Sequence, residues 1–392
     1  MKPAGFACWR YRGNTKCLHG FPQGEACWRY REVFIMYQKR MERVLAGLRE
    51  MGLSQMIICN PKSIFYLTGI DLSPMERLFA LYIHESGNHK LFLNDMFTVP
   101  HTGIEEIWIN DTQNAVEIVA ANVDAAADMG IDANWPARFL LPLMQINGGV
   151  QYKLASDAVD LVRAQKDEAE RERMREASLL NDRCMEALES FIHDGITEKA
   201  CVDFISDFYE KNGASGCSFD PIVGFGPNAA DPHHQSDSTV LKEGDCVLID
   251  TGCVKDGYCS DMTRVFFWKK ASEEHLKIHD IVRRANELAE AAIKPGVRFC
   301  DLDKIARDYI SSFGYGEFFT HRLGHSIGIE CHEHGDVSAV NEDVVKVGNA
   351  FSIEPGIYLK GDVGVRIEDL VIVTEDGCEI LNHHDKEYKI LT

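Results

Sequence analysis

Two acidic residues stand beside strongly apolar runs in the middle of this 392-residue chain. Asp250 directly follows the run CVLI at 246–249, and Asp261 comes shortly before the run VFFW at 265–268. Short apolar runs of this kind predict buried strands, and a carboxylate beside a buried strand is costly unless it has a partner. The fold that this chain adopts must therefore supply a compensating group for both acids.

The residues between the two runs predict how they pair. Asp256-Gly257 is a strong two-residue hairpin signal, so Asp250 should oppose Thr263. In that register, and without a bulge, Asp261 lies diagonally from Asp250 on the same face, with the two backbones about 7–8 Å apart or less. The two carboxylates can then converge on a shared point.

Further acidic and histidine residues lie downstream in similar apolar segments. In the run 363–373, the two-residue alternation of a strand places Arg366 and Glu368 on one face. A strand is also expected over 350–359, where Glu354 stands directly before Pro355-Gly356. The segment 321–334 supplies three further candidates, which are His321, His325 and His332.

Four acids embedded in apolar strands need a compensating charge. They are Asp250, Asp261, Glu354 and Glu368. Close together they would repel, raise each other's pKa values and become protonated. Salt bridges to Arg264 or Arg366 could satisfy any one of them, but not all four. Two divalent cations held about 3.5–4 Å apart by bridging carboxylates would do so, and the residues therefore predict a metal centre.

The length of the chain exceeds what one compact core accommodates, so we expect two domains. Residues 36–155 alternate short apolar runs with helical stretches, which predicts an α/β domain. In residues 156–392 helices alternate with strands, which predicts a mostly antiparallel, curved sheet covered by helices. The expected helices of both domains cover 37–51, one or two stretches within 156–192, 197–209, 273–293 and 301–314.

The first 35 residues contain the hexapeptide ACWRYR twice, at 7–12 and at 26–31. They lack the apolar region and the cleavage motif of a signal peptide, and two short copies cannot stack as a repeat fold. We interpret residues 1–35 as a leader outside the domains. A basic, aromatic arm that binds membrane or RNA is the alternative.

Composition excludes several classes of partner. The formal net charge of −20 argues against nucleic acid, because a binding face would have to overcome a repulsive field. No apolar run approaches the ~20 residues that span a bilayer, so we expect no membrane insertion. Thirteen scattered cysteines without a C-x-x-C pair indicate reduced thiols. These features predict a cytoplasmic protein.

The segments that carry the candidate residues resemble the pita-bread metallopeptidases, peptidase family M24. The sequences IDTGCVKDGYCSDMTRVF, HRLGHSIGIECHE, IEPGIYL and GVRIEDLV are similar to motifs of its Xaa-Pro branch, in the same order. NPKSIFYLTGI is similar to the N-terminal domain of that branch. The resemblance extends from about Met36 to the end. It implies a creatinase/prolidase-like N-terminal domain, a pita-bread catalytic domain and a homodimer.

The resemblance also implies a set of five metal ligands. Asp250 would hold one ion, and His325 and Glu354 would hold the other. Asp261 and Glu368 would bridge the two ions. This oxygen-rich set favours two divalent ions such as Mn²⁺ or Co²⁺ over a structural Zn²⁺.

The remaining implied roles concern the substrate. His233 and His332 would contact the scissile bond and stabilise developing charge, and Glu354 would carry a proton to the leaving nitrogen. His321 and Arg366 match outer, supporting positions. The implied substrate is a proline-containing dipeptide or a peptide N-terminus.

The function implied by the resemblance is hydrolysis of Xaa-Pro bonds, by a proline dipeptidase or an Xaa-Pro aminopeptidase. The sequence leaves the choice between these two open. The alternatives are a creatinase-like hydrolase without metals, a metal-dependent lyase, and a binding protein without catalysis. The intact ligand set argues against the first and the third of these.

The chain departs from the family pattern without losing a ligand. Asp231 precedes Pro232-His233 where the family usually has an apolar residue. Cys331 precedes His332 where a branched aliphatic residue is usual. The histidines His234 and His334 are additional.

Overall fold

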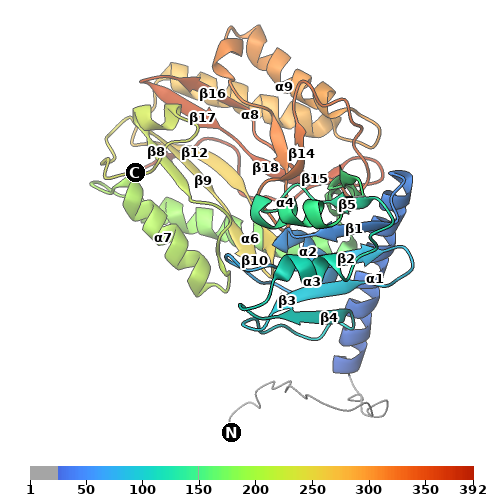
Figure 1. Cartoon of the computed structure of the whole chain (residues 1–392). Coiled ribbons are helices and arrows are strands. Elements are labelled where there is room, and N and C mark those ends of the chain that lie inside the picture. The colour runs from blue at the N-terminus through green and yellow to red at the C-terminus, as the bar shows by residue number, and fades with distance from the viewer. Residues whose placement is uncertain (1–24, 149) are drawn as a thin grey trace.

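The computed structural model describes residues 25–148 and 150–392, which form an N-terminal and a C-terminal unit (Figure 1). The N-terminal unit combines helices with a six-stranded sheet, and the C-terminal unit carries mostly antiparallel strands between helices. The fold class expected from the sequence, an α/β domain followed by a helix-covered antiparallel domain, is therefore confirmed.

The N-terminal unit is built on a mixed sheet with strand order β4-β3-β2-β1-β5-β6. The pairings among β1, β2 and β3 are antiparallel, and the others are parallel. Its strands are β1 (Gln55–Ile58), β2 (Ala80–His84), β3 (Lys90–Asn94), β4 (Glu105–Ile109), β5 (Met129–Ile131) and β6 (Tyr152–Leu154). Its helices are α1 (Glu25–Glu50), α2 (Pro61–Thr68), α3 (Ala115–Ala120) and α4 (Ala137–Ile146).

Helix α1 covers most of the stretch 37–51 in which the sequence predicts a helix, and it buries apolar residues along one face. Met41, Val44 and Leu48 are each at most 8% exposed. The helix begins at Glu25, earlier than expected, so the second ACWRYR copy lies within it. The first copy falls outside the described residues, and the interpretation of the first 35 residues as a leader stays a prediction.

In the C-terminal unit, α8 and α9 lie on one side of the strands and α6 and α7 on the other (Figure 1). The helices are α5 (Asp157–Ala164), α6 (Glu168–Phe191), α7 (Glu198–Lys211), α8 (Glu273–Ala292) and α9 (Phe299–Ser312), with 3₁₀ turns η1 (Gly226–Ala230) and η2 (Gly316–Phe318). The stretch 156–192 thus forms two helices.

The strands of the C-terminal unit form two larger sheets, ordered β20-β12-β9-β8 and β14-β13-β15-β18-β19, and two small ones, β11-β10-β7 and β16-β17. The first eight are β7 (Gly216–Cys217), β8 (Ile222–Phe225), β9 (Cys246–Thr251), β10 (Cys253–Lys255), β11 (Tyr258–Cys259), β12 (Met262–Trp268), β13 (Gly324–Ser326) and β14 (Glu333–Val337). The last six are β15 (Ala350–Ile353), β16 (Gly356–Leu359), β17 (Val363–Arg366), β18 (Asp369–Val373), β19 (Cys378–Ile380) and β20 (Ile390–Leu391).

Side-chain caps fix where two of these helices begin. Thr197 accepts a hydrogen bond from the backbone N–H of Ala200 at 3.2 Å, as expected for the N-cap of α7. At the start of α6, Asp167 and Glu170 exchange hydrogen bonds with each other's backbone N–H. This capping box separates α6 from α5.

The first acid-bearing hairpin pairs β9 with β12 in the predicted register. Thr263 opposes Asp250, and the turn residues Asp256 and Gly257 both have positive φ, 49° and 81°. A two-residue turn with positive φ at both positions matches the twist of the flanking strands. Asp261 therefore lies two residues from Thr263, on the face that Asp250 shares.

The second hairpin joins the segments 350–359 and 363–373 and is interrupted at its acids. The sequence predicts one strand in each segment, but each contains two, β15 and β16 in the first and β17 and β18 in the second. Pro355 has no N–H to donate to the ladder. The pairing register is the same on both sides of the break, which places Glu354 opposite Glu368.

The two hairpins meet along Thr263 and Glu368. The backbone N–H of Glu368 donates to the carbonyl of Thr263 at 3.2 Å. Arg264 reinforces the junction from the other side, because it donates to the carbonyl of Glu368 at 2.7 Å and to the carboxylate of Asp369 at 2.7 Å. The acids of both hairpins are thereby brought to one place.

Ion pairs and a hydrogen bond from Arg163 connect α2 and α5 to the end of the loop between β13 and β14 and to the start of β14. Arg163 donates to Glu330 at 2.8 Å, to Glu333 at 2.7 Å and to the hydroxyl of Ser63 at 3.2 Å. Lys166 donates to the second oxygen of Glu333 at 2.9 Å.

Among the described residues, no helix combines the length and the apolar character that crossing a bilayer requires.

Candidate metal centre

The two hairpins direct their acidic side chains into one buried cluster. The Thr263 hydroxyl donates to Glu368 Oε2 at 2.8 Å, and Arg366 donates to Thr263 Oγ1 at 3.0 Å and to Asp250 Oδ2 at 2.6 Å. Arg366 and Glu368 therefore share a face, as the alternation in the sequence predicts.

His325 reaches the cluster from β13, which pairs with β15 of the second hairpin. Its Nε2 lies 3.6 Å from Asp261 Oδ2 and 3.6 Å from Glu354 Oε1. One ligand atom each from Asp261, His325 and Glu368 lies within 4.8 Å of the others. A single cation can therefore contact an oxygen or nitrogen of all three residues.

The cluster is shielded from water and incompletely paired. Asp250, Asp261, His325 and Glu368 are at most 8% exposed. Within the described residues, Oδ1 of Asp250 and Oδ1 of Asp261 have no hydrogen-bond partner. Buried carboxylate oxygens without donors are what a bound cation would satisfy, so the residues present fit a metal site.

The pKa values of the cluster show the cost of collecting these charges. Burial, followed by the charge of Asp250, raises the pKa of Asp261 well above its ordinary value. Burial and Asp261 raise the pKa of Glu368 in the same way. Burial raises the pKa of Glu354 to about 7. Mutual repulsion of this kind was expected from the sequence, and divalent ions would relieve it.

Arginine side chains compensate only part of this charge. Arg366 pairs with Asp250 at 2.6 Å, whereas Arg264 pairs with Asp369, outside the cluster. In the part of the chain that the structure describes, no lysine or arginine forms an ion pair with Asp261, Glu354 or Glu368. Salt bridges therefore do not account for the cluster.

The imidazole of His325 is in the form that binds metal. Burial, followed by the neighbouring His332, lowers the pKa of His325 to about 3, so the ring is neutral at physiological pH. Its Nδ1 lies 3.3 Å from the carbonyl of Ser326, which leaves Nε2 facing the acids. A neutral ring with one nitrogen oriented by the backbone is the usual state of a histidine ligand.

His321 and Arg366 are joined by Tyr358, a residue that was not predicted from the sequence. The hydroxyl of Tyr358 lies 2.9 Å from His321 Nε2 and accepts a hydrogen bond from Arg366 at 2.8 Å. The signal was available, because alternation from Glu354 through Gly356 places Tyr358 on the same face. A Cβ at Gly356 would lie 2.6 Å from the Tyr358 hydroxyl, so the glycine leaves room for it.

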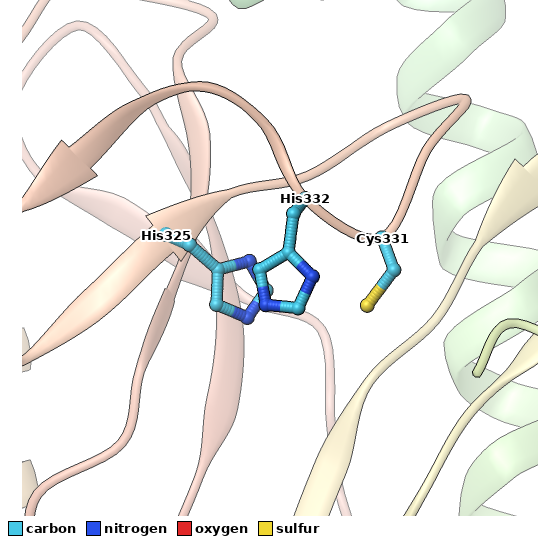
Figure 2. Close-up of side chains that lie close together, drawn as sticks. All are labelled: His325, Cys331 and His332. Carbon is cyan, nitrogen blue, oxygen red and sulfur yellow. The ribbon is translucent and has the colours of Figure 1, made fainter. Parts of the chain in front are cut away.

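The two substrate-contacting histidines suggested by the resemblance lie on the open side of the cluster. His332 is exposed, and its ring centroid is 4.1 Å from that of His325 (Figure 2). His233 is exposed on the segment after η1. Burial is the main cause that lowers the pKa values of His321 and His332, and His233 contributes to both shifts. Contacts connect the predicted site residues other than His233, whose electrostatic influence on His321 and His332 is the indication that it lies near them.

Cys331 lies against the cluster. Its thiol donates to Asp261 Oδ2 at 3.3 Å. Figure 2 shows Cys331 and His332 leaving the same loop beside His325. The sequence comparison with the family pattern had singled out Cys331 as unusual. Its contact with Asp261 of the first hairpin could not be predicted from the sequence, because the two residues lie 70 positions apart.

Comparison with known proteins agrees with this geometry. The model of metallopeptidase family M24 matches residues 172–375, and the creatinase/prolidase N-terminal domain matches residues 40–165. A sequence described as an uncharacterised peptidase of Staphylococcus haemolyticus is 38% identical over 353 residues, covering 88% of this chain and 99% of its own length.

Solved structures give the same result. The dipeptidase PepE from Mycobacterium ulcerans is 33% identical with a TM-score of 0.86, covering 91% of this chain and 98% of its own. A prolidase from Thermococcus sibiricus is 31% identical with a TM-score of 0.84, covering 91% and 99%. The similarity therefore extends over both units.

Proposed function

Because this chain belongs to metallopeptidase family M24, we propose that it hydrolyses Xaa-Pro bonds, as a proline dipeptidase or an Xaa-Pro aminopeptidase. The observation that carries the proposal is the cluster of four carboxylates around His325, two of which have an oxygen without a hydrogen-bond partner in the described part of the chain. The names of the solved dipeptidase and prolidase relatives support the substrate class.

We assign five residues of the cluster to two divalent ions, with Mn²⁺ as the expected metal and Co²⁺ or Zn²⁺ as alternatives. Asp250 would hold one ion, His325 and Glu354 the other, and Asp261 and Glu368 would bridge. When bound, such a pair supplies a nucleophilic hydroxide at neutral pH and polarises the scissile carbonyl.

Glu354 is the group that we assign to proton transfer. The Ser352 hydroxyl donates to its Oε1 at 3.2 Å, which holds the carboxylate in place. An Xaa-Pro bond is a tertiary amide, so its nitrogen has no hydrogen and must gain a proton to leave. A carboxylate beside the reacting carbonyl can take a proton from the attacking water and deliver it to the nitrogen as the C–N bond breaks.

Neutral and charged groups around the cluster position the reactants. Arg366, which donates to Asp250, is itself fixed by the Tyr358 hydroxyl. His321 orients that hydroxyl from its other side. On the open side, His332 and His233 can donate hydrogen bonds to the substrate and stabilise charge that develops on the carbonyl oxygen.

The test compares three peptides on the purified chain with added Mn²⁺. A dipeptide and a tripeptide that share the same Xaa-Pro bond should separate a dipeptidase from an aminopeptidase, and the matched Xaa-Ala dipeptide is the control. We expect proline-selective cleavage and two metal ions per chain by elemental analysis. Metal-loaded protein that cleaves neither proline peptide, or that cleaves Xaa-Ala equally well, would overturn the substrate assignment.

A further inference from the structure

Three side chains beside the carboxylate cluster form a second group with metal-ligand chemistry. Ligand atoms of His325, Cys331 and His332 all lie within 4.8 Å of one another. Cys331 and His332 come from the loop between β13 and β14, and His325 lies on β13 (Figure 2). The group thus shares His325 with the carboxylate set.

The two groups have opposite chemical preferences. The set of four carboxylates and one imidazole offers hard oxygen donors that suit Mn²⁺. One thiol and two imidazoles form a soft set, which suits Zn²⁺ or Cd²⁺ in tetrahedral coordination. Asp261 Oδ2, which lies 3.3 Å from the Cys331 sulfur, could supply the fourth ligand. The same region can therefore hold different metals with different donor atoms.

We propose that His325, Cys331 and His332 bind a thiophilic cation such as Cd²⁺ in a way that excludes the hydrolytic metal pair. The inference rests on the proposed function, because it concerns the same centre. When the ion binds, the Cys331 S–H bond breaks, a sulfur–metal bond forms, and the proton passes to solvent.

Geometry makes the two modes of binding mutually exclusive. His325 Nδ1 lies against the carbonyl of Ser326 at 3.3 Å, so Nε2 is the nitrogen that either metal set would use. An ion bound to Cys331 would also draw Asp261 Oδ2 away from its proposed bridging role. The same ion would coordinate the imidazole of His332, which we assign to substrate contact. A thiophilic ion at this place is therefore inhibitory.

A neighbouring cysteine provides a matched control. Cys259 is buried like Cys331 and lies two residues before Asp261. Its thiol donates to the backbone carbonyl of Ile329 at 3.5 Å, and it belongs to neither metal-binding group. Cys259→Ala removes a buried thiol from the same region without touching the proposed site.

The primary experiment measures binding of Cd²⁺ alone to the full metal-free chain. Wild type and Cys259→Ala should show the same ultraviolet thiolate–Cd²⁺ absorption, and Cys331→Ala should lack the part that titrates first. Cd²⁺ affinity should fall at least about tenfold in Cys331→Ala. Cys331→Ser should behave like Cys331→Ala, because its oxygen is a hard donor. Thermal melts of the metal-free variants check that each one folds.

The second experiment asks whether the two metal sets compete. Protein loaded with Mn²⁺ is titrated with Cd²⁺, and the retained Mn²⁺ is counted by elemental analysis. Wild type and Cys259→Ala should lose Mn²⁺ at Cd²⁺ concentrations at least about tenfold lower than Cys331→Ala. Equal Cd²⁺ absorption and equal displacement in wild type and Cys331→Ala would overturn the inference. Absence of Xaa-Pro cleavage with Cys331-dependent displacement would instead refute only the substrate assignment.

Discussion

Asp261 is 4% exposed and has two very different oxygen atoms. Oδ2 accepts the thiol of Cys331, while Oδ1 has no hydrogen-bond partner among the described residues. A buried polar atom in that state costs about 1–3 kcal/mol, and more when it is charged. The same atom is a free donor for a cation, so metal binding and the stability of the metal-free fold oppose each other here.

Asp261→Asn should separate these two effects. The variant keeps the shape of the side chain but removes the charge, so metal-free protein should gain at least about 1 kcal/mol in unfolding free energy at neutral pH. Turnover should fall more than about 100-fold, with loss of bound metal. Urea unfolding in the presence of chelator and elemental analysis measure the two quantities. A variant that is less stable than wild type without metal would contradict the argument.

Glu354 should leave a signature in the pH dependence of stability. Its folded-state pKa is raised to about 7 from the ordinary value of 4.5, so the folded chain binds a proton that the unfolded chain releases. The stabilisation from this protonated form is complete below about pH 4.5 and is lost as pH rises towards 7.

Glu354→Gln removes this contribution, because glutamine does not titrate. In the presence of chelator, wild type should lose stability relative to Glu354→Gln as pH rises from 4.5 to 7. The histidine contributions are common to both proteins and cancel in the difference. Unfolding free energies of the two proteins, determined at matched pH values, measure this difference in stability. A difference that stays constant over this range would show that Glu354 is not protonated in the fold.

At the scale of single elements, the turn between β10 and β11 sets the register of the first hairpin. Gly257 has a φ of 81°, and a Cβ at this position would lie 2.9 Å from the ring of Phe65 on α2. The turn therefore needs glycine for its backbone and for its packing against another element. Gly87 offers the backbone requirement alone, with a φ of 82° and no atom within 4 Å of a built Cβ.

Gly257→Ala and Gly87→Ala form a matched pair that separates the two requirements. Each should lose about 1–2 kcal/mol for placing a Cβ on a left-handed backbone. Gly257→Ala should lose more, since Phe65 must move, and should also weaken metal binding because Asp250 and Asp261 depend on the hairpin register. Urea midpoints and metal titrations provide the measurements. Equal losses in both variants would show that the Phe65 contact is unimportant.

The second hairpin shows an element that its sequence predicts only in part. Both long strands were expected, and their pairing is as regular as the pattern suggests. The break at Glu354 and Pro355 follows from the missing N–H of proline. Its position opposite Glu368 depends on the loop that closes the hairpin, which the strand pattern does not specify.

At the scale of the whole molecule, Arg163 ties α2 and α5 to the loop that carries Cys331 and His332. Its guanidinium and Glu333 are each only 5% exposed at the side chain. Burial raises the pKa of Glu333, but Lys166 and then Arg163 outweigh it and lower the value to about 2. The ion pairs of Glu333 therefore stabilise the folded chain fully at pH values above the ordinary carboxyl pKa of 4.5, and this stabilisation is lost as the pH falls towards 2.

Arg163→Met should destabilise the protein by about 3–5 kcal/mol, because it removes one of the two cationic partners of the buried Glu333 carboxylate. Turnover should fall as well, since the loop would no longer hold His332 in position. The matched control is Arg175→Met, whose pair with Glu379 is partly exposed and should cost about 1 kcal/mol or less. Calorimetric melts and kcat decide the comparison, and equal losses would refute a positioning role.

The sequence by itself determined the local strand pairing that prepares the carboxylate cluster. Acids beside apolar runs, with the Asp256-Gly257 turn, predicted a register that the structure reproduces. These features are local, because alternation and turn geometry act over a few neighbouring residues. The motif order further predicted the family, which the comparisons confirm.

Only the tertiary structure decided which groups from different hairpins meet. Thr263 against Glu368, Tyr358 between His321 and Arg366, and the Cys331 thiol on Asp261 join positions far apart in the chain. Such contacts arise from the packing of whole sheets, where sub-ångström differences in approach decide whether atoms bond. A pattern with a period of two residues carries no information about them.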